Sequence, residues 1–238
     1  MIRWVSAVVD RPARKLDVVV EFWAAVSGSA AGPPDTAGLV GLHSDRGDDY
    51  LRVQGVLDGP GGVHLDLSVD DVPEFIEQAV EAGASVVADQ RILTSPAGLP
   101  FCVLPWKGEH RRTRPFGGPD GALSRVHQVC LDIAPVEFGP ELGFWTRLTG
   151  WALDTTGLPV FSRLCPEPPI PIRILLQRLG EPRPASAHMD ISSADIPAAR
   201  AWHETLGAAF VGEWPHWTTM RDPAGVVYCL TRGNPATD

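Results

Sequence analysis

Basic residues are scarce in this chain relative to acidic ones. Its 238 residues include 20 Lys and Arg against 29 Asp and Glu, which gives a formal net charge of -9 at pH 7. Nucleic-acid binders concentrate positive charge on one face to neutralise phosphates, so the acidic balance argues against a nucleic-acid partner. The one basic cluster, residues 110–114, lies in a stretch rich in Gly and Pro, and we interpret it as part of a solvated linker.

Long apolar runs are also missing. Asp, Arg, Gly or Pro interrupts every hydrophobic stretch before it reaches the length of a membrane span, so we expect no membrane partner. The N-terminal residues show no signal-peptide pattern. Cysteines are few and widely spaced in a chain large enough to need no disulfides: Cys102, Cys130, Cys165 and Cys229. We therefore expect reduced thiols and a cytoplasmic location.

Several common catalytic motifs are absent. The sequence has no G-x-S-x-G nucleophile elbow, no Gly-rich loop with phosphate-binding spacing, and no C-x-x-C pair. Their absence argues against a hydrolase elbow, a nucleotide-phosphate loop and a C-x-x-C zinc or redox site. Any chemistry must therefore come from side chains that the fold brings together.

An internal repeat is the strongest feature that the sequence does contain. His64 and His188 are 124 residues apart, and the same offset relates Asp66 to Asp190, Asp71 to Asp195, Pro73 to Pro197 and Gly83 to Gly207. Earlier in each half, an offset of 122 residues relates Phe22 and Trp23 to Phe144 and Trp145. So many matches at a constant offset indicate a duplicated unit with small insertions or deletions.

Hydrophobic periodicity predicts the same order of elements in both halves. In the first half we expect strands over residues 4–10, 39–43, 50–56, 63–69, 85–87 and 99–104, with helices over 17–28 and from 72 to 83. In the second half we expect strands over 126–132, 160–164, 173–179, 188–192, 217–221 and 226–231, with helices over 140–150 and 196–207. Each half thus contains two strand-helix-strands units. The length suits two compact domains, 1–107 and 124–238, joined by a linker over 108–123.

Alternation along the strand at 63–69 places His64 and Asp66 on one face and the apolar residues on the other. A helix follows, with Asp71 as its expected N-cap and Gly83 as its expected left-handed end. The repeat predicts the same arrangement around His188 and Asp190.

These features resemble the vicinal oxygen chelate superfamily, which includes glyoxalase I, fosfomycin and bleomycin resistance proteins and extradiol dioxygenases. The resemblance rests on FWAAVSG and FWTRLTG, on HLDLSVDD…EAGA and HMDISSAD…TLGA, and on the final RDPAGVVYCL. The variant most similar to the chain is the glyoxalase-like domain common in bacteria. The resemblance implies an α+β fold in which four βαβββ modules form two tandem domains with curved mixed sheets around barrel-like clefts. It does not select an activity, because this fold hosts lyases, isomerases, dioxygenases, epimerases and drug-binding proteins.

The resemblance also implies positions for metal ligands. In the second domain these positions correspond to His127, Gln177, His188 and Cys229. In the first domain they correspond to Val5, Gln54, His64 and Cys102. The family usually has a Glu where this chain has the two cysteines, and valine cannot coordinate a metal, so a metal is not expected in the first domain. In the second domain the donors would suit a divalent ion such as Zn, Mn, Fe or Ni, with a thiolate favouring zinc.

Structural roles compete with each of these functional ones. Free cysteine is among the most buried residue types, so packing is the better explanation of Cys102 and Cys229. A strand histidine oriented by a neighbouring carboxylate needs no ligand, which describes His64 with Asp66 and His188 with Asp190 equally well.

Two functions remain. The first is a protein that binds a small organic molecule in its cleft, lined by His64, Asp66, Gln54, Trp217 and Asp190. The second is a metal-dependent enzyme of the lyase, isomerase or dioxygenase type that uses His127 and His188. The missing Glu favours the binding protein, and the paired histidines of the second domain keep the enzyme open. No residue is assigned a catalytic role, and a homodimer is compatible with the sequence.

Overall fold

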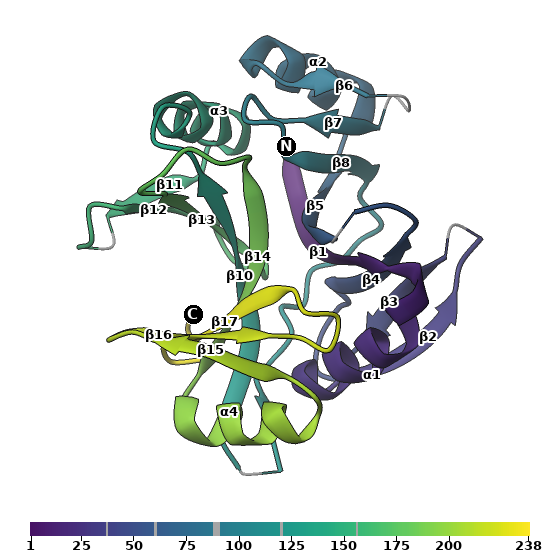
Figure 1. Ribbon diagram of the computed structural model, residues 1–238. Coiled ribbons are helices and arrows are strands. Elements are labelled where there is room, and N and C mark those ends of the chain that lie inside the picture. The colour runs from purple at the N-terminus through teal and green to yellow at the C-terminus, as the bar shows by residue number, and fades with distance from the viewer. Residues whose placement is uncertain (37, 60, 88–90, 120, 156) are drawn as a thin grey trace. The chain divides into compact units, whose positions relative to one another are not determined.

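The computed structural model describes residues 1–36, 38–59, 61–87, 91–119, 121–155 and 157–238. Its strands form two mixed sheets, drawn in Figure 1. The first sheet has eight strands in the order β2-β3-β4-β1-β5-β8-β7-β6. The second has nine: the order is β11-β12-β13-β10-β14-β17-β16-β15, and β9 pairs with β10 beside this path. Each order ends in edge strands, so the sheets are open and not closed barrels.

The first half of the chain supplies the first sheet and two long helices. Its elements are β1 (Ile2–Pro12), a 3-10 turn η1 (Ala13–Lys15), α1 (Leu16–Ser27), β2 (Ala30–Pro34), β3 (Leu39–His43), β4 (Leu51–Val56), β5 (Gly62–Val69), α2 (Val72–Ala82), β6 (Ser85–Val86), β7 (Ile92–Thr94) and β8 (Pro100–Pro105).

The second half repeats this order. Its elements are β9 (Phe116–Gly117), β10 (Leu123–Ile133), α3 (Phe138–Thr149), β11 (Ala152–Thr155), β12 (Phe161–Cys165), β13 (Arg173–Arg178), β14 (Ser186–Ser193), α4 (Ile196–Thr205), β15 (Ala209–Glu213), β16 (Trp217–Arg221) and β17 (Val227–Arg232). Among the described residues, none of the helices combines the length and the hydropathy that a membrane crossing requires.

The predicted α+β fold of two tandem glyoxalase-like repeats is confirmed, including all four helices. Both sheets are open and not closed barrels, and the barrel-like clefts stay a prediction. The sequence also missed short strands near the sheet edges, among them β2, β7, β11 and β15. The residues of β2 and β15 are almost all exposed, so these strands show no alternation between buried and exposed positions that could reveal them.

The helix ends follow local rules that the sequence predicted. Asp71 caps α2: its Oδ1 accepts a hydrogen bond from the Glu74 main-chain N–H at 3.0 Å. Asp195 caps α4 in the same way, through the N–H of Ala198 at 3.1 Å. Gly83 ends α2 with a φ of 118°, in the region that favours glycine. Each cap fixes where a helix leaves the strand that precedes it.

Contacts divide the chain into two compact units, each of which takes one module from each repeat. The α2/α3 unit comprises residues 1–7, 64–110 and 129–187. The α1/α4 unit comprises residues 8–63, 111–128 and 188–238. The predicted boundaries, 1–107 and 124–238 with a linker over 108–123, stay predictions about the tandem repeats, and residue 120 of that linker lies outside the described residues.

The core of the α1/α4 unit is an aromatic cluster between its two helices and β17. Phe22 and Trp23 of α1 make edge-to-face contacts with Tyr228, and Phe22 also meets His203 of α4. In the same unit, the Nε of the fully buried Arg11 donates a hydrogen bond to Asp222 Oδ2 at 2.6 Å. The core of this unit is therefore built from residues near both ends of the chain.

The α2/α3 unit has a related core around Trp145, the repeat partner of Trp23. Phe101 and Phe144 pack against Trp145, and the Trp145 Nε1–H donates to the buried Glu141 at 2.8 Å. The other carboxylate oxygen of Glu141 accepts the N–H of Ala97 at 2.9 Å. Both tryptophans are core residues, as their equivalent positions in the repeat predicted.

The interpretation of residues 110–114 as a solvated linker was wrong for part of that segment. Thr113 is buried, and its hydroxyl donates to the main-chain oxygen of Asp48 at 2.9 Å. The Arg111 N–H donates to an Asp48 carboxylate oxygen, although most of the Arg111 side chain is exposed. Long-range hydrogen bonds to a loop about 60 residues earlier hold this segment, and composition could not reveal them.

Candidate ligand-binding face of the second sheet

One face of β14, β17 and β16 gathers four of the residues that the sequence indicated: His188, Asp190, Trp217 and Cys229. β14 is parallel to β17, with Asp190 beside Cys229 and Ser192 beside Thr231. β16 is antiparallel to β17, with Thr219 beside Cys229 and Trp217 beside Thr231. Paired residues point to the same side of a sheet and alternate residues share a face. We call the resulting set the His188 face: His188, Asp190, Ser192, Trp217, Thr219, Cys229 and Thr231.

The centre of the His188 face is a histidine flanked by a carboxylate and a thiol. His188 Nε2 lies 3.5 Å from Asp190 Oδ1 and 3.7 Å from Cys229 Sγ. Cys229 Sγ in turn lies 3.6 Å from the Thr219 hydroxyl. The sequence favoured packing as the role of Cys229, but these contacts place its thiol in a polar row.

A glutamine that sequence reasoning missed extends this row. The Gln128 Nε2–H donates to Asp190 Oδ2 at 2.6 Å, and both side chains are buried. Gln128 directly follows His127 on β10. The family resemblance indicated His127 and not Gln128. The contact between Gln128 and Asp190 becomes visible only once β10 is placed beside β14.

His127 contacts another part of the face. Its Nε2 lies 3.1 Å from the hydroxyl of Thr231, which pairs across the strands with Trp217. Trp214 stacks on Trp217 with ring centroids 5.6 Å apart and an interplanar angle of 7°. Because Trp214 is 44% exposed, this edge of the face offers an aromatic surface that solvent reaches.

Two other predicted donors contact different parts of the fold. Gln177 lies on β13 in the α2/α3 unit, where its Oε1 is 3.9 Å from the thiol of Cys130. Gln54 lies on β4 in the α1/α4 unit, paired with Leu39. Their predicted roles as ligand or cleft residues stay predictions.

The α2/α3 unit repeats the histidine, carboxylate and thiol at the same register. Asp66 of β5 pairs with Cys102 of β8, and His64 Nε2 lies 3.5 Å from Asp66 Oδ1. The possible ligand atoms of these three residues lie within 4.8 Å of one another. Val5, at the expected first-strand ligand position, is fully buried and apolar. The duplication has thus preserved a local His-Asp-Cys arrangement in both sheets.

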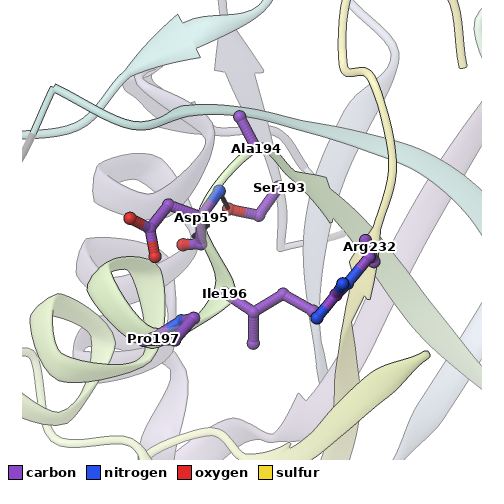
Figure 2. Close-up of a pocket in the computed structure, with 6 residues that line it drawn as sticks. All are labelled: Ser193, Ala194, Asp195, Ile196, Pro197 and Arg232. Carbon is purple, nitrogen blue, oxygen red and sulfur yellow. Dashed lines mark hydrogen bonds between the residues drawn. The ribbon is translucent and has the colours of Figure 1, made fainter. Parts of the chain in front are cut away.

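A shallow pocket of about 310 Å³ lies where β14 leads into α4, beside the end of β17 (Figure 2). It is lined by Ser193, Ala194, Asp195, Ile196, Pro197 and Arg232. Ser193 and Arg232 follow Ser192 and Thr231, and successive strand residues face opposite sides. Asp195 and Ser193 are engaged in capping the start of α4, so this pocket is separate from the His188 face.

Comparison with known proteins agrees with this architecture. The model of a family described as glyoxalase-like domain matches residues 6–104 and 128–231. The chain therefore has the two tandem repeats of a vicinal oxygen chelate protein. It belongs to the glyoxalase-like domain family. A search of curated protein sequences gives no match.

Solved structures with the same fold include ring-cleaving dioxygenases. The 2,2',3-trihydroxybiphenyl 1,2-dioxygenase of Sphingomonas wittichii is 17% identical with a TM-score of 0.64, over 98% of this chain and 91% of that one. The 2,3-dioxygenase LapB of a Pseudomonas species is 13% identical with a TM-score of 0.67, over 98% and 93%. A variant of homoprotocatechuate 2,3-dioxygenase from B. fuscum, in complex with HPCA, is 12% identical with a TM-score of 0.64, over 98% and 72%. At these identities the likeness concerns the fold alone.

Proposed function

We propose that this chain is a binding protein for a small, flat organic molecule, which it holds on the His188 face of the α1/α4 unit. The observation that carries the proposal is the cross-strand row from the stacked Trp214 and Trp217 to Thr231 and His127. An indole surface provides apolar contact area, while the hydroxyl and imidazole provide a small number of orienting polar groups. This combination is typical of sites for aromatic ligands.

The names of the structural neighbours suggest which molecules to try. These names refer to a trihydroxybiphenyl and to homoprotocatechuate, which are built of flat aromatic rings and carry adjacent hydroxyl groups. On the His188 face, such hydroxyls would find acceptors and donors at His188, Asp190 and Thr231. Location in the cytoplasm, a homodimeric state and a relation to bleomycin resistance stay predictions from the sequence.

Calorimetric titration with 2,2',3-trihydroxybiphenyl and homoprotocatechuate tests the proposal. We expect at least one of them to bind, and Trp217→Leu to weaken that binding by about tenfold, the usual effect of removing an aromatic anchor. Trp202→Leu is the matched control, because Trp202 lies on α4, where it contacts Phe116 and His203, and is not part of the His188 face. Binding that both variants lower equally, or no binding of either compound, would contradict the proposal.

A second candidate function follows from the His-Asp-Cys arrangement. Nitrogen, carboxylate oxygen and thiolate sulfur are the ligands that zinc prefers, at about 2.0 to 2.3 Å from the ion. Around a tetrahedral ion such ligands stand roughly 3.5 Å apart, which matches the distances of 3.5 and 3.7 Å from His188 Nε2 to Asp190 Oδ1 and Cys229 Sγ. His188, Asp190 and Cys229 therefore supply donor types that zinc takes, and the His188 nitrogen lies near both of the other donors. A bound ion would polarise ligand oxygens, and Gln128 would hold Asp190 in place.

Metal content per chain, measured by mass spectrometry after dialysis against zinc, distinguishes the two candidates. A metal-dependent function predicts one retained ion that His188→Ala or Cys229→Ser removes. His43→Ala is the matched control, because His43 is an exposed histidine of β3 that lies outside both His-Asp-Cys arrangements. Absence of retained zinc would rule out this second candidate and leave the binding proposal intact.

A further inference from the structure

The segment after β17 folds back so that Asp238 lies on the His188 face. The Asp238 side chain accepts a hydrogen bond from the hydroxyl of Ser192, a fully buried residue of that face. The Asp238 main-chain oxygen accepts a bond from Nη2 of Arg112. Hydrogen bonds from the N–H groups of Thr237 and Asp238 to the main-chain oxygen of Asn234 shape the turn. A carboxylate of the chain itself therefore occupies this part of the face.

Gly233 makes room for that carboxylate. A Cβ at position 233 would overlap the Asp238 carboxylate and would lie 2.6 Å from Ser192 Oγ. Gly233 directly follows β17, two residues after Thr231, so its missing side chain would point to the same side as Thr231. The glycine leaves a space that fits an oxygen-bearing group, with the Ser192 hydroxyl as a donor.

Positive charge surrounds the same end of the sheet. The Tyr50 hydroxyl donates to the main-chain oxygen of Val126 at 3.0 Å, just before His127. Burial raises the pKa of Tyr50 to about 12, and the positive charges of Arg125, Arg46 and Arg112 oppose that rise. The three guanidinium groups therefore lie near enough to act on this one buried hydroxyl. One of the three, Arg112, also bonds the main-chain oxygen of Asp238. Guanidinium groups stabilise a bound anion.

We propose that Ser192, Gly233 and Arg112 form a carboxylate-binding site at the end of the His188 face, and that the physiological ligand carries a carboxylate that displaces Asp238. This inference rests on the proposed function and adds to it the chemical class of the ligand. The aromatic part of the ligand lies on Trp217, and its carboxylate takes the position of Asp238. The chain's own residues 234–238 then compete with the ligand for the site.

Two probes that differ only in charge test the inference. Homoprotocatechuate carries a carboxylate, and its carboxamide has the same shape without the charge. We expect the wild-type protein to bind the acid more tightly than the amide. Asp238→Ala removes the internal carboxylate that accepts from Ser192, although the main-chain oxygen that Arg112 bonds remains. It should tighten binding of the acid at least fivefold, with less than a twofold effect on the amide.

Arg112→Gln should weaken binding of the acid by about tenfold or more, as expected for a hydrogen bond to a charged group, and leave the amide unchanged. Arg111→Gln is the matched control: it is the next residue, but it pairs with Asp48. Thermal melting checks that each variant is folded. If acid and amide bind equally, or if Arg112→Gln acts no differently from Arg111→Gln, the carboxylate site is wrong while the binding proposal stands. If neither probe binds to the wild type or to Asp238→Ala, the carboxylate site is wrong, and the binding proposal falls only if 2,2',3-trihydroxybiphenyl also fails to bind.

Discussion

His203 provides a direct test of the packing in the α1/α4 unit. It is fully buried on α4, its Nδ1 lies 2.8 Å from the Tyr228 hydroxyl, and Phe22 covers the ring edge-on. Within the described residues, its Nε2 is buried and has no hydrogen-bond partner. A second proton would therefore be buried without compensation, and burial lowers the pKa of His203 to about 4.

The sign of the pH effect follows from this depressed pKa. An unfolded histidine has a pKa of about 6.5, so between pH 6.5 and 4 the unfolded chain binds a proton that the folded chain rejects. Stability contributed by the neutral ring is complete above pH 6.5 and is lost as the pH falls through this window, by about 1.4 kcal/mol per pH unit. At pH 5 the loss amounts to about 2 kcal/mol relative to pH 8.

Urea denaturation at pH 8 and pH 5 measures this loss, with the double variant His203→Phe/Tyr228→Phe as the comparison. The double variant removes the titrating group and the hydroxyl that would otherwise lose its partner, while keeping the aromatic cluster. We expect the free energy of unfolding of the wild type to fall between the two pH values by about 2 kcal/mol more than that of the variant. If the two proteins lose the same stability, the burial argument for His203 is refuted.

Three further substitutions test other interactions of the fold. Asp222→Ala should lower the free energy of unfolding by about 3 to 5 kcal/mol, because Arg11 would stay buried without its carboxylate partner. Glu204→Gln removes an exposed ion pair and should lower it by less than about 0.5 kcal/mol. Urea denaturation measures both losses, and similar losses would contradict the reasoning. Asp71→Ala should cost about 1 kcal/mol through the lost cap of α2, and an unchanged denaturation midpoint would show that this hydrogen bond does not stabilise the helix.

Much of the fold could be predicted from the sequence because its signals are local or repeated. The constant offset between the two halves does not depend on any contact, and caps such as Asp71 and Asp195 act within four residues. The alternation of strand residues is enough to place His188 and Asp190 on one face. The edge strand β15 escaped prediction because its exposed residues give no periodic pattern.

The candidate site was less predictable, because its neighbours come from distant parts of the chain. The sequence indicated His188 and Cys229, but their distance depends on the register of two parallel strands joined by a long crossover. The choice of Gln128 as the partner of Asp190 depends on how β10 meets β14.

The sequence by itself determined the duplicated α+β fold and the chemical types of residue on one face of each central strand. Only the tertiary structure decided which of those residues meet: Trp217 with Thr231, His127 with the same hydroxyl, and Asp238 with Ser192 and Arg112. The physical reason is that periodicity and caps arise between residues a few positions apart. Strand register and the return of residues 234–238 to β14 are instead set by packing and hydrogen bonds summed over the whole unit, which no short segment contains.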